Sequence, residues 1–115
     1  MSLYNLVYSN VNVSNTVVTI KPTPGKIAGF HIYNANTTAT LFVQLFNANA
    51  AGGVTLGTTT PFIVFPIPAA NPYGATYPNE NHIQFSNGIT IAVTTTPTGA
   101  TGGAGANLLA TIFYK

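Results

Sequence analysis

Short apolar segments broken by turn residues run through the whole chain, and they limit the folds that it can adopt. Thr, Val, Ile, Phe and Tyr are abundant, and Gly and Pro recur at short intervals. This composition is typical of strands and tight turns. No stretch has the sustained 3.6-residue apolar period of an amphipathic helix. The sequence therefore predicts an all-β protein.

The alternation of apolar and polar residues predicts about eight strands. We expect them at residues 3–8, 11–20, 26–34, 40–47, 62–67, 82–85, 89–95 and 108–114. Strands of this number and spacing favour an antiparallel β-sandwich of two sheets, jelly-roll-like. The 115 residues fit a single domain over 1–115.

The strand predicted at 26–34 divides its side chains between two faces. One face holds Ile27, Gly29, His31 and Tyr33, and the other holds Ala28, Phe30, Ile32 and Asn34. The strand at 40–47 has apolar residues on both faces, which favours a place inside a sheet. Pro66 and Pro68 restrict the second half of the strand at 62–67 to a sheet edge or to an exit from the sheet, because proline cannot donate to a ladder.

The connections carry their own expectations. Asn87-Gly88 is a strong hairpin pattern, so we expect residues 82–85 and 89–95 to pair with each other. Residues 71–81 contain two prolines and a glycine and are predicted to be irregular. Residues 49–60 and 96–106 are rich in Gly, Ala and Thr and are predicted to be loops. The first of these is too poor in large apolar residues to contribute to the core.

Charge is almost absent. The only charged side chains are Lys21, Lys26, Glu80 and Lys115. They make up 3% of the chain, against about 25% in an ordinary soluble domain. There is no Asp, Arg or Cys. Paired carboxylates, a Ser-His-Asp triad and a metal-ligand cluster cannot be built from this set. We therefore expect no enzyme, no metal site and no cofactor.

The two histidines, His31 and His82, offer one catalytic alternative. Glu80 lies two residues before His82, and the two side chains could form an acid/base pair. A surface loop with two polar residues explains the same pattern and is the favoured interpretation.

The net charge of +2 does not indicate a nucleic-acid binder. The lysines are not clustered along the chain, whereas neutralising many phosphates needs clustered Lys and Arg. No apolar run approaches the length of about 18 residues that spans a bilayer, and no secretion signal is visible. We expect a protein that is made in the cytoplasm and binds neither nucleic acid nor membrane.

Two tyrosines suggest a binding platform. Tyr73 and Tyr77 lie in the proline-rich segment, where exposed aromatic rings could stack on sugars as in a carbohydrate-binding module. Alternatively, they cover the end of the sandwich or fill a subunit interface, where Tyr is enriched.

An ordered series of short motifs resembles small β-rich structural proteins of tailed bacteriophages. The motifs are Tyr33-Asn34, Val43-Gln44-Leu45-Phe46-Asn47, Gly57-Thr58-Thr59-Thr60-Pro61, Pro66-Ile67-Pro68-Ala69, the segment from Phe85 to Thr95, and Phe113-Tyr114-Lys115. The resemblance covers residues 26–115. It implies a virion structural role, with the capsid decoration (cement) protein as the first expectation. It carries no catalytic residues. The chain departs from this family in having almost no Asp or Lys in its long loops.

Such a role implies partners. We expect the major capsid protein or other virion proteins to bind the chain, which would itself form a homo-oligomer, with a trimer favoured. Residues 1–10 are apolar and uncharged, and they form either an interface strand or arm, or the first strand of the subunit's own sandwich. The expected contact residues are Leu3, Tyr4, Leu6 and Tyr8. A tail, neck or fibre-associated virion protein of the same fold is the alternative to a place on the capsid surface.

Overall fold

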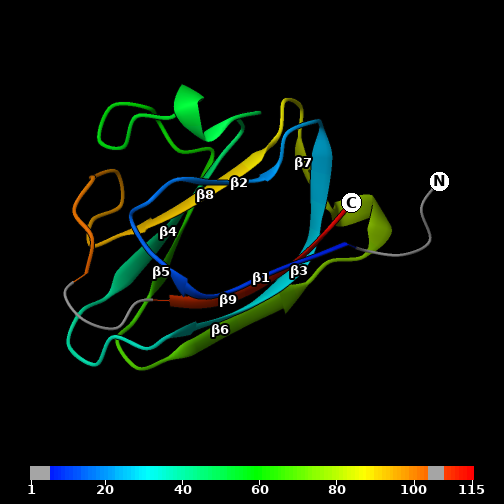
Figure 1. Cartoon of the computed structure of the whole chain (residues 1–115). Coiled ribbons are helices and arrows are strands. Elements are labelled where there is room, and N and C mark those ends of the chain that lie inside the picture. Colours follow the sequence, from blue (N-terminus) through cyan, green and yellow to red (C-terminus); the bar gives the residue numbers. More distant parts are fainter. Residues whose placement is uncertain (1–5, 104–107) are drawn as a thin grey trace.

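The computed structural model describes residues 6–103 and 108–115, which form a sandwich of two antiparallel sheets (Figure 1). The strands are β1 (Leu6–Val13), β2 (Val18–Lys21), β3 (Gly25–Asn34), β4 (Leu41–Phe46), β5 (Ile63–Ile67), β6 (Pro72–Thr76), β7 (Ile83–Phe85), β8 (Ile89–Thr94) and β9 (Leu108–Tyr114). Two short 3-10 helices, η1 (Ala51–Gly53) and η2 (Asn79–Asn81), lie in the connections. The predicted all-β, two-sheet antiparallel fold is confirmed.

The strand order is that of a jelly roll. The five-stranded sheet has the order β1-β9-β3-β6, with β7 also paired to β3, and the four-stranded sheet has the order β2-β8-β4-β5. The pairs β1·β9, β2·β8, β3·β6 and β4·β5 are nested along the chain. A long antiparallel hairpin rolled into two layers has this pairing. The jelly-roll-like prediction is therefore confirmed, and the short β7 is an addition to the eight principal strands.

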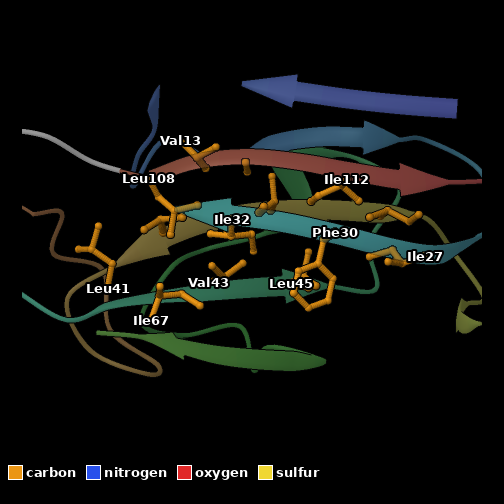
Figure 2. Packing of buried hydrophobic residues seen from close by; sticks show 14 of the residues in the cluster. Val13, Ile27, Phe30, Ile32, Leu41, Val43, Leu45, Ile67, Leu108 and Ile112 are labelled. Carbon is orange, nitrogen blue, oxygen red and sulfur yellow. The ribbon is translucent and has the colours of Figure 1, made fainter. Parts of the chain in front are cut away.

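Apolar side chains from both sheets fill the space between the layers (Figure 2). Phe30 and Ile32 of β3 face Val43 and Leu45 of β4, and all four are at most 3% exposed. Their spacing of two residues follows from the strand pleat, which sends alternate side chains to one face. The strand β4 lies between β8 and β5, as its two apolar faces predict.

The edge position predicted for the strand at 62–67 is confirmed. The proline-containing β5 ends the four-stranded sheet, and β1 ends the five-stranded sheet. Ring contact between Phe65 of β5 and Tyr73 of β6 shows that these two terminal strands face each other across one side of the sandwich. The strands β1 and β5 therefore lie on opposite sides.

The expected alternation of β3 is wrong at its start. Ile27 was expected on the face of His31, but it is 1% exposed and lies in the same core cluster as Phe30. The register against β9 shifts between Ile27 and Gly29, which marks a β-bulge. The extra residue of a bulge reverses the face of every residue that precedes it. The alternation holds from Phe30 onwards.

Two strand boundaries also differ from the sequence expectation. The segment predicted as one strand at 11–20 is divided, because residues up to Val13 belong to β1 and the chain enters the other sheet at β2. Residues 71–81 were expected to be irregular, but 72–76 form β6 against β3. Pro72 is the first residue of this edge strand, a position where its missing N–H costs no ladder bond.

The predicted hairpin at Asn87-Gly88 is wrong. The strand β7 pairs with β3 in one sheet, whereas β8 lies between β2 and β4 in the other. Gly88 is needed for space: a Cβ there would lie 2.6 Å from the Ala48 carbonyl oxygen and 2.7 Å from the Lys21 carbonyl oxygen. Asn87 donates its N–H to Asn47 Oδ1 at 2.8 Å, which fixes the crossover between the sheets.

Candidate functional site

The outer face of the four-stranded sheet is covered by the chain itself. Its outward side chains on β4 and β8 include Gln44, Phe46, Thr90, Ala92 and Thr94, and each is at most 1% exposed. Such a face is normally half solvated in an antiparallel sheet. Here the part over β4 and β8 is buried as fully as the core between the sheets, whereas Val64 of the edge strand β5 is half-buried and Pro66 is exposed.

Two connections provide the cover. Val54 and Leu56 pack with Phe46 and Ala92 in a small second apolar cluster. Thr90 Oγ1 donates to the Ala48 carbonyl at 2.9 Å, at the start of the same connection. The expectation that residues 49–60 contribute nothing to the core is therefore wrong, because Val54 is only 8% exposed.

The second connection, from β8 towards β9, is held by Gln44. Gln44 Nε2 donates to Thr94 Oγ1 at 2.6 Å and to the Gly99 carbonyl at 3.1 Å. Thr94 Oγ1 donates in turn to the Thr96 carbonyl at 2.7 Å. The amide nitrogen of Gln44 therefore ties this connection to the sheet, whereas its Oε1 is buried without a hydrogen-bond partner among the described residues.

The outer face of the five-stranded sheet is open by contrast. Exposed or half-buried outward residues run across it in register, and they are Val7, Ser9, Leu109, Thr111, Phe113, His31, Tyr33, Pro72 and Gly74. None of them is Lys, Arg, Asp or Glu. Val7, Tyr33 and Leu109 are 57%, 42% and 40% exposed. We call this set of nine residues the open face.

The open face, which is uncharged, also contains a hollow. A shallow hollow of about 440 Å³ lies over β3, β6 and β9, between Tyr33, Pro72 and Leu109. His31 and Phe113 meet edge to face, with ring centroids 5.9 Å apart. Gly74 has no side chain beside His31, and a Cβ there would lie 2.9 Å from His31 Nδ1. These contacts keep the two rings in place on the sheet.

A second candidate site is a pocket of about 630 Å³ at one end of the sandwich. Its lining residues are Lys21, Pro24, Gly25, Lys26, Asn47, Phe62, His82, Gln84, Phe85, Ser86 and Lys115. We call it the end pocket. In Figure 1 the turn from β2 to β3, the helix η2 and the C-terminus lie towards the right, away from the β8–β9 connection at the left.

The jelly-roll pairing brings all three lysines to the end pocket. Lys21 ends β2, Lys26 follows the first residue of β3, and Lys115 follows β9. Lys26 and Lys115 exchange two main-chain hydrogen bonds of 3.0 and 2.9 Å. The three lysines, which are far apart along the chain, therefore lie together in the folded structure, and the expectation that they do not cluster is wrong. The sequence does not reveal this cluster, because Lys26 and Lys115 are brought together only by the register in which β3 pairs with β9.

The two histidines lie at different places in the fold, and among the described residues no hydrogen bond or ion pair joins Glu80 to either of them. His82 Nε2 lies 3.1 Å from the Tyr77 carbonyl oxygen, and its ring lines the end pocket. His31 lies on the open face, and Glu80 lies in η2. Among the described residues, no group of three or more His, Cys, Asp or Glu side chains could hold a metal ion.

The predicted contact residues at the start of the chain have different environments. Leu3 and Tyr4 lie outside the described residues. Leu6 is 54% exposed on β1, whereas Tyr8 is half-buried, packs against the core and accepts a hydrogen bond of 3.0 Å from Asn10 Nδ2. The strand β1 pairs with β9, so it belongs to the subunit's own sandwich and also forms its edge.

The two tyrosines of the expected platform pack between the sheet edges. Tyr73 lies 5.6 Å from Phe30 and 6.0 Å from Phe65 between ring centroids, and Tyr77 lies 6.3 Å from Phe30. Burial, with a smaller contribution from Tyr73, raises the pKa of the Tyr77 phenol above its usual 10.0. The rings lie over the side of the core where β6 faces β5, and Tyr73 is still 45% exposed there.

The chain was compared with protein-family models, with curated proteins and with solved structures. None of the three comparisons gives a significant match. Over the described residues, none of the helices is long and apolar enough to cross a membrane. The candidate sites therefore stand on their geometry alone: an uncharged open face on one sheet, and a lysine-lined end pocket.

Proposed function

We propose that the protein is a structural component of a tailed-bacteriophage virion, a decoration (cement) protein bound at junctions between major capsid proteins. One observation carries the proposal. The chain buries one outer sheet face under its own connections and leaves the open face uncovered, with apolar side chains such as Tyr33 and Leu109 in contact with solvent.

The composition of the open face is that of a contact surface. Interface centres are depleted in charge and enriched in aromatic residues, and Tyr33 and Phe113 fit that pattern. Contiguous apolar patches on soluble proteins commonly mark interaction sites. A chain with four charged side chains also lacks the charged coat that keeps monomers apart.

The mechanism of such a protein is mechanical. A protein that binds the assembled shell and not its separated subunits stabilises the shell through linkage, in proportion to its affinity and concentration. Contact with several capsid subunits at once needs a rigid body. A sandwich with a dry core, and with most outward side chains of the inner strands β4 and β8 buried as well, supplies that rigidity.

The free edges suggest how copies would associate. The strands β1 and β5 are terminal in different sheets and lie on opposite sides of the sandwich. Pairing the β1 edge of one copy with the β5 edge of the next is a head-to-tail contact, and such contacts form rings when the rotation closes. A ring of three copies is the favoured arrangement. Neither edge strand carries a charged residue to oppose pairing, although Pro66 removes one donor from the β5 edge and so limits pairing to the rest of that strand.

The test combines mass measurement in solution with co-sedimentation on expanded, empty capsids. We expect an oligomer, favoured as a trimer, that sediments with the shells and raises their resistance to heat or pressure. Tyr33→Ser/Leu109→Ser should remove shell binding and leave the unfolding midpoint nearly unchanged. Thr58→Ala, in the connection over the other sheet, is the matched control and should bind as the wild type does.

A monomer that ignores capsids would contradict the proposal. Electron microscopy of particles then separates the capsid from the tail, the neck and the fibres, which the alternative virion role would occupy. Binding to those parts and not to the shell would favour that alternative.

A further inference from the structure

We propose that the end pocket receives a carboxylate-bearing peptide segment of a partner protein, with an acidic side chain near Lys21 and Lys26 and an apolar neighbour against Phe62. This inference rests on the proposed function only in naming the partner as a virion protein. The pocket itself is a separate surface from the open face.

The positive charge around the end pocket is the first observation that supports a carboxylate ligand. The chain carries three lysines and one acidic side chain, and all three lysines line this single pocket, whereas Glu80 does not. The positive potential of the side chains is therefore collected at one end of the molecule. A cleft lined by one sign of charge focuses the field and raises the local concentration of the opposite charge.

Local packing holds one of these lysines over the pocket. A Cβ at Gly25 would lie 2.8 Å from Lys21 Cδ and 2.6 Å from the Lys115 carbonyl oxygen. The glycine therefore lets the aliphatic stem of Lys21 cross the turn between β2 and β3. Lysine stems commonly lie along apolar surface in this way while the ammonium group stays in water.

The wall beside the lysines is apolar. Phe62 and Phe85 meet with ring centroids 5.2 Å apart at an interplanar angle of 69°. Phe85 is 1% exposed and belongs to the core, whereas Phe62 is 51% exposed and presents its ring to the pocket. Asn47 donates to Ser86 Oγ at 2.9 Å and fixes the polar wall. A pocket of about 630 Å³ lies within the usual range for binding sites, about 300–1,000 Å³.

A peptide fits this set better than a nucleic acid does. A single strand needs a groove of cations that follows many phosphates. The chain has no lysine or arginine beyond the three at this pocket, so no such track can exist. An acidic side chain next to an aromatic or aliphatic one needs only a local cation and a local apolar wall.

The experiment titrates the full chain with the peptide Glu-Glu-Phe-Glu-Glu and follows backbone amide signals by NMR. We expect shifts at Lys26, Phe85 and Ser86, and binding that weakens as salt is added, because exposed ion pairs are screened. K21Q/K26Q should bind about tenfold more weakly, because it removes both cations that the acidic side chain contacts. The wild type should bind the peptide Gln-Gln-Phe-Gln-Gln no more tightly than K21Q/K26Q binds the Glu peptide.

The matched control keeps the net charge and moves its position. K21Q/T98K places the lost charge on an exposed residue of the β8–β9 connection, at the other end of the sandwich. It should bind the peptide as weakly as K21Q alone. Wild-type affinity in K21Q/T98K or in K21Q/K26Q would overturn the inference.

Two other outcomes would also overturn it: equal binding of the Glu and Gln peptides, or tighter binding of an oligo-dT strand than of the Glu peptide. The proposed function is decided separately by the capsid assay. If the wild-type chain binds capsids but does not bind the Glu peptide, the decoration role stands and this site is removed.

Discussion

The two sheets share one core but treat their outer faces in opposite ways. The four-stranded sheet buries Gln44, Phe46 and Ala92 under connections of its own chain. The five-stranded sheet leaves Tyr33 and Leu109 exposed on the open face. Covering one face makes a rigid body without charge, and the other face stays bare for the partner that we propose. Substitutions on the two faces should therefore affect different properties.

The largest expected difference comes from one aromatic residue on each face. Phe46→Ala should lower the free energy of unfolding by about 3–5 kcal/mol, because it empties a site that is 1% exposed. Tyr33→Ala should change it by about 1 kcal/mol or less, since the ring is 42% exposed. Urea unfolding of both variants measures the difference. Equal losses would show that the open face is as structural as the covered one.

The close packing under the cover gives the next effect. Gly88→Ala should destabilise by about 3 kcal/mol, because the added Cβ meets backbone atoms of Ala48, Asn49 and Lys21 at 2.6–2.7 Å. Gly53→Ala in η1 is the matched control. A Cβ there meets nothing within 4 Å, and the change should stay within about 0.5 kcal/mol. Thermal unfolding of the two variants tests the contrast, and similar melting temperatures would contradict it.

Substitution of one polar residue on each face should give a smaller difference in stability. Gln44→Ala should cost about 2 kcal/mol, because the carbonyl of Gly99 then loses a buried donor. Faster amide hydrogen exchange in the β8–β9 connection should accompany the loss. His31→Ala on the open face should leave both stability and exchange in that connection near the wild-type values. Unchanged exchange in Gln44→Ala would show that the amide does not hold the cover.

The smallest effect concerns the side of the sandwich between β5 and β6. Burial raises the pKa of Tyr77 in the folded state above its value of 10.0 in the unfolded chain. The unfolded state therefore loses this proton first, and the stability that Tyr77 contributes is full below pH 10 and falls as the pH rises through the folded pKa. Tyr77→Phe should reduce this alkaline loss, as seen in unfolding midpoints from pH 9 to 12. The same pH profile in Tyr77→Phe and in the wild type would contradict the burial of the Tyr77 phenol.

The fold was predictable because its signals are local. Alternation along 40–47 and prolines at 66 and 68 are read directly from the sequence, and they correctly predict an inner strand β4 and an edge strand β5. The bulge at residues 27–29 was missed, because an extra residue in a strand leaves no mark on composition. The Asn-Gly pair was misinterpreted, because the sequence does not reveal that Gly88 is needed for close packing against Ala48.

The candidate sites were less predictable, because they depend on long-range pairing. The apolar residues on both faces of 40–47, Phe46 among them, were the visible sign that the outer face of this sheet is buried. The cluster of lysines needs Lys26 beside Lys115, two residues at distant positions in the chain that only the β3–β9 register brings together. The open face likewise appears only when strands β1, β9, β3 and β6 are placed in order.

Cryo-electron microscopy of expanded capsids mixed with the full chain tests the central claim most directly. The account predicts density at junctions between capsid subunits, with the open face turned towards the shell or a neighbouring copy and the connection over β4 and β8 turned outwards. Bare shells, or bound copies whose Tyr33 and Leu109 face solvent, would contradict it.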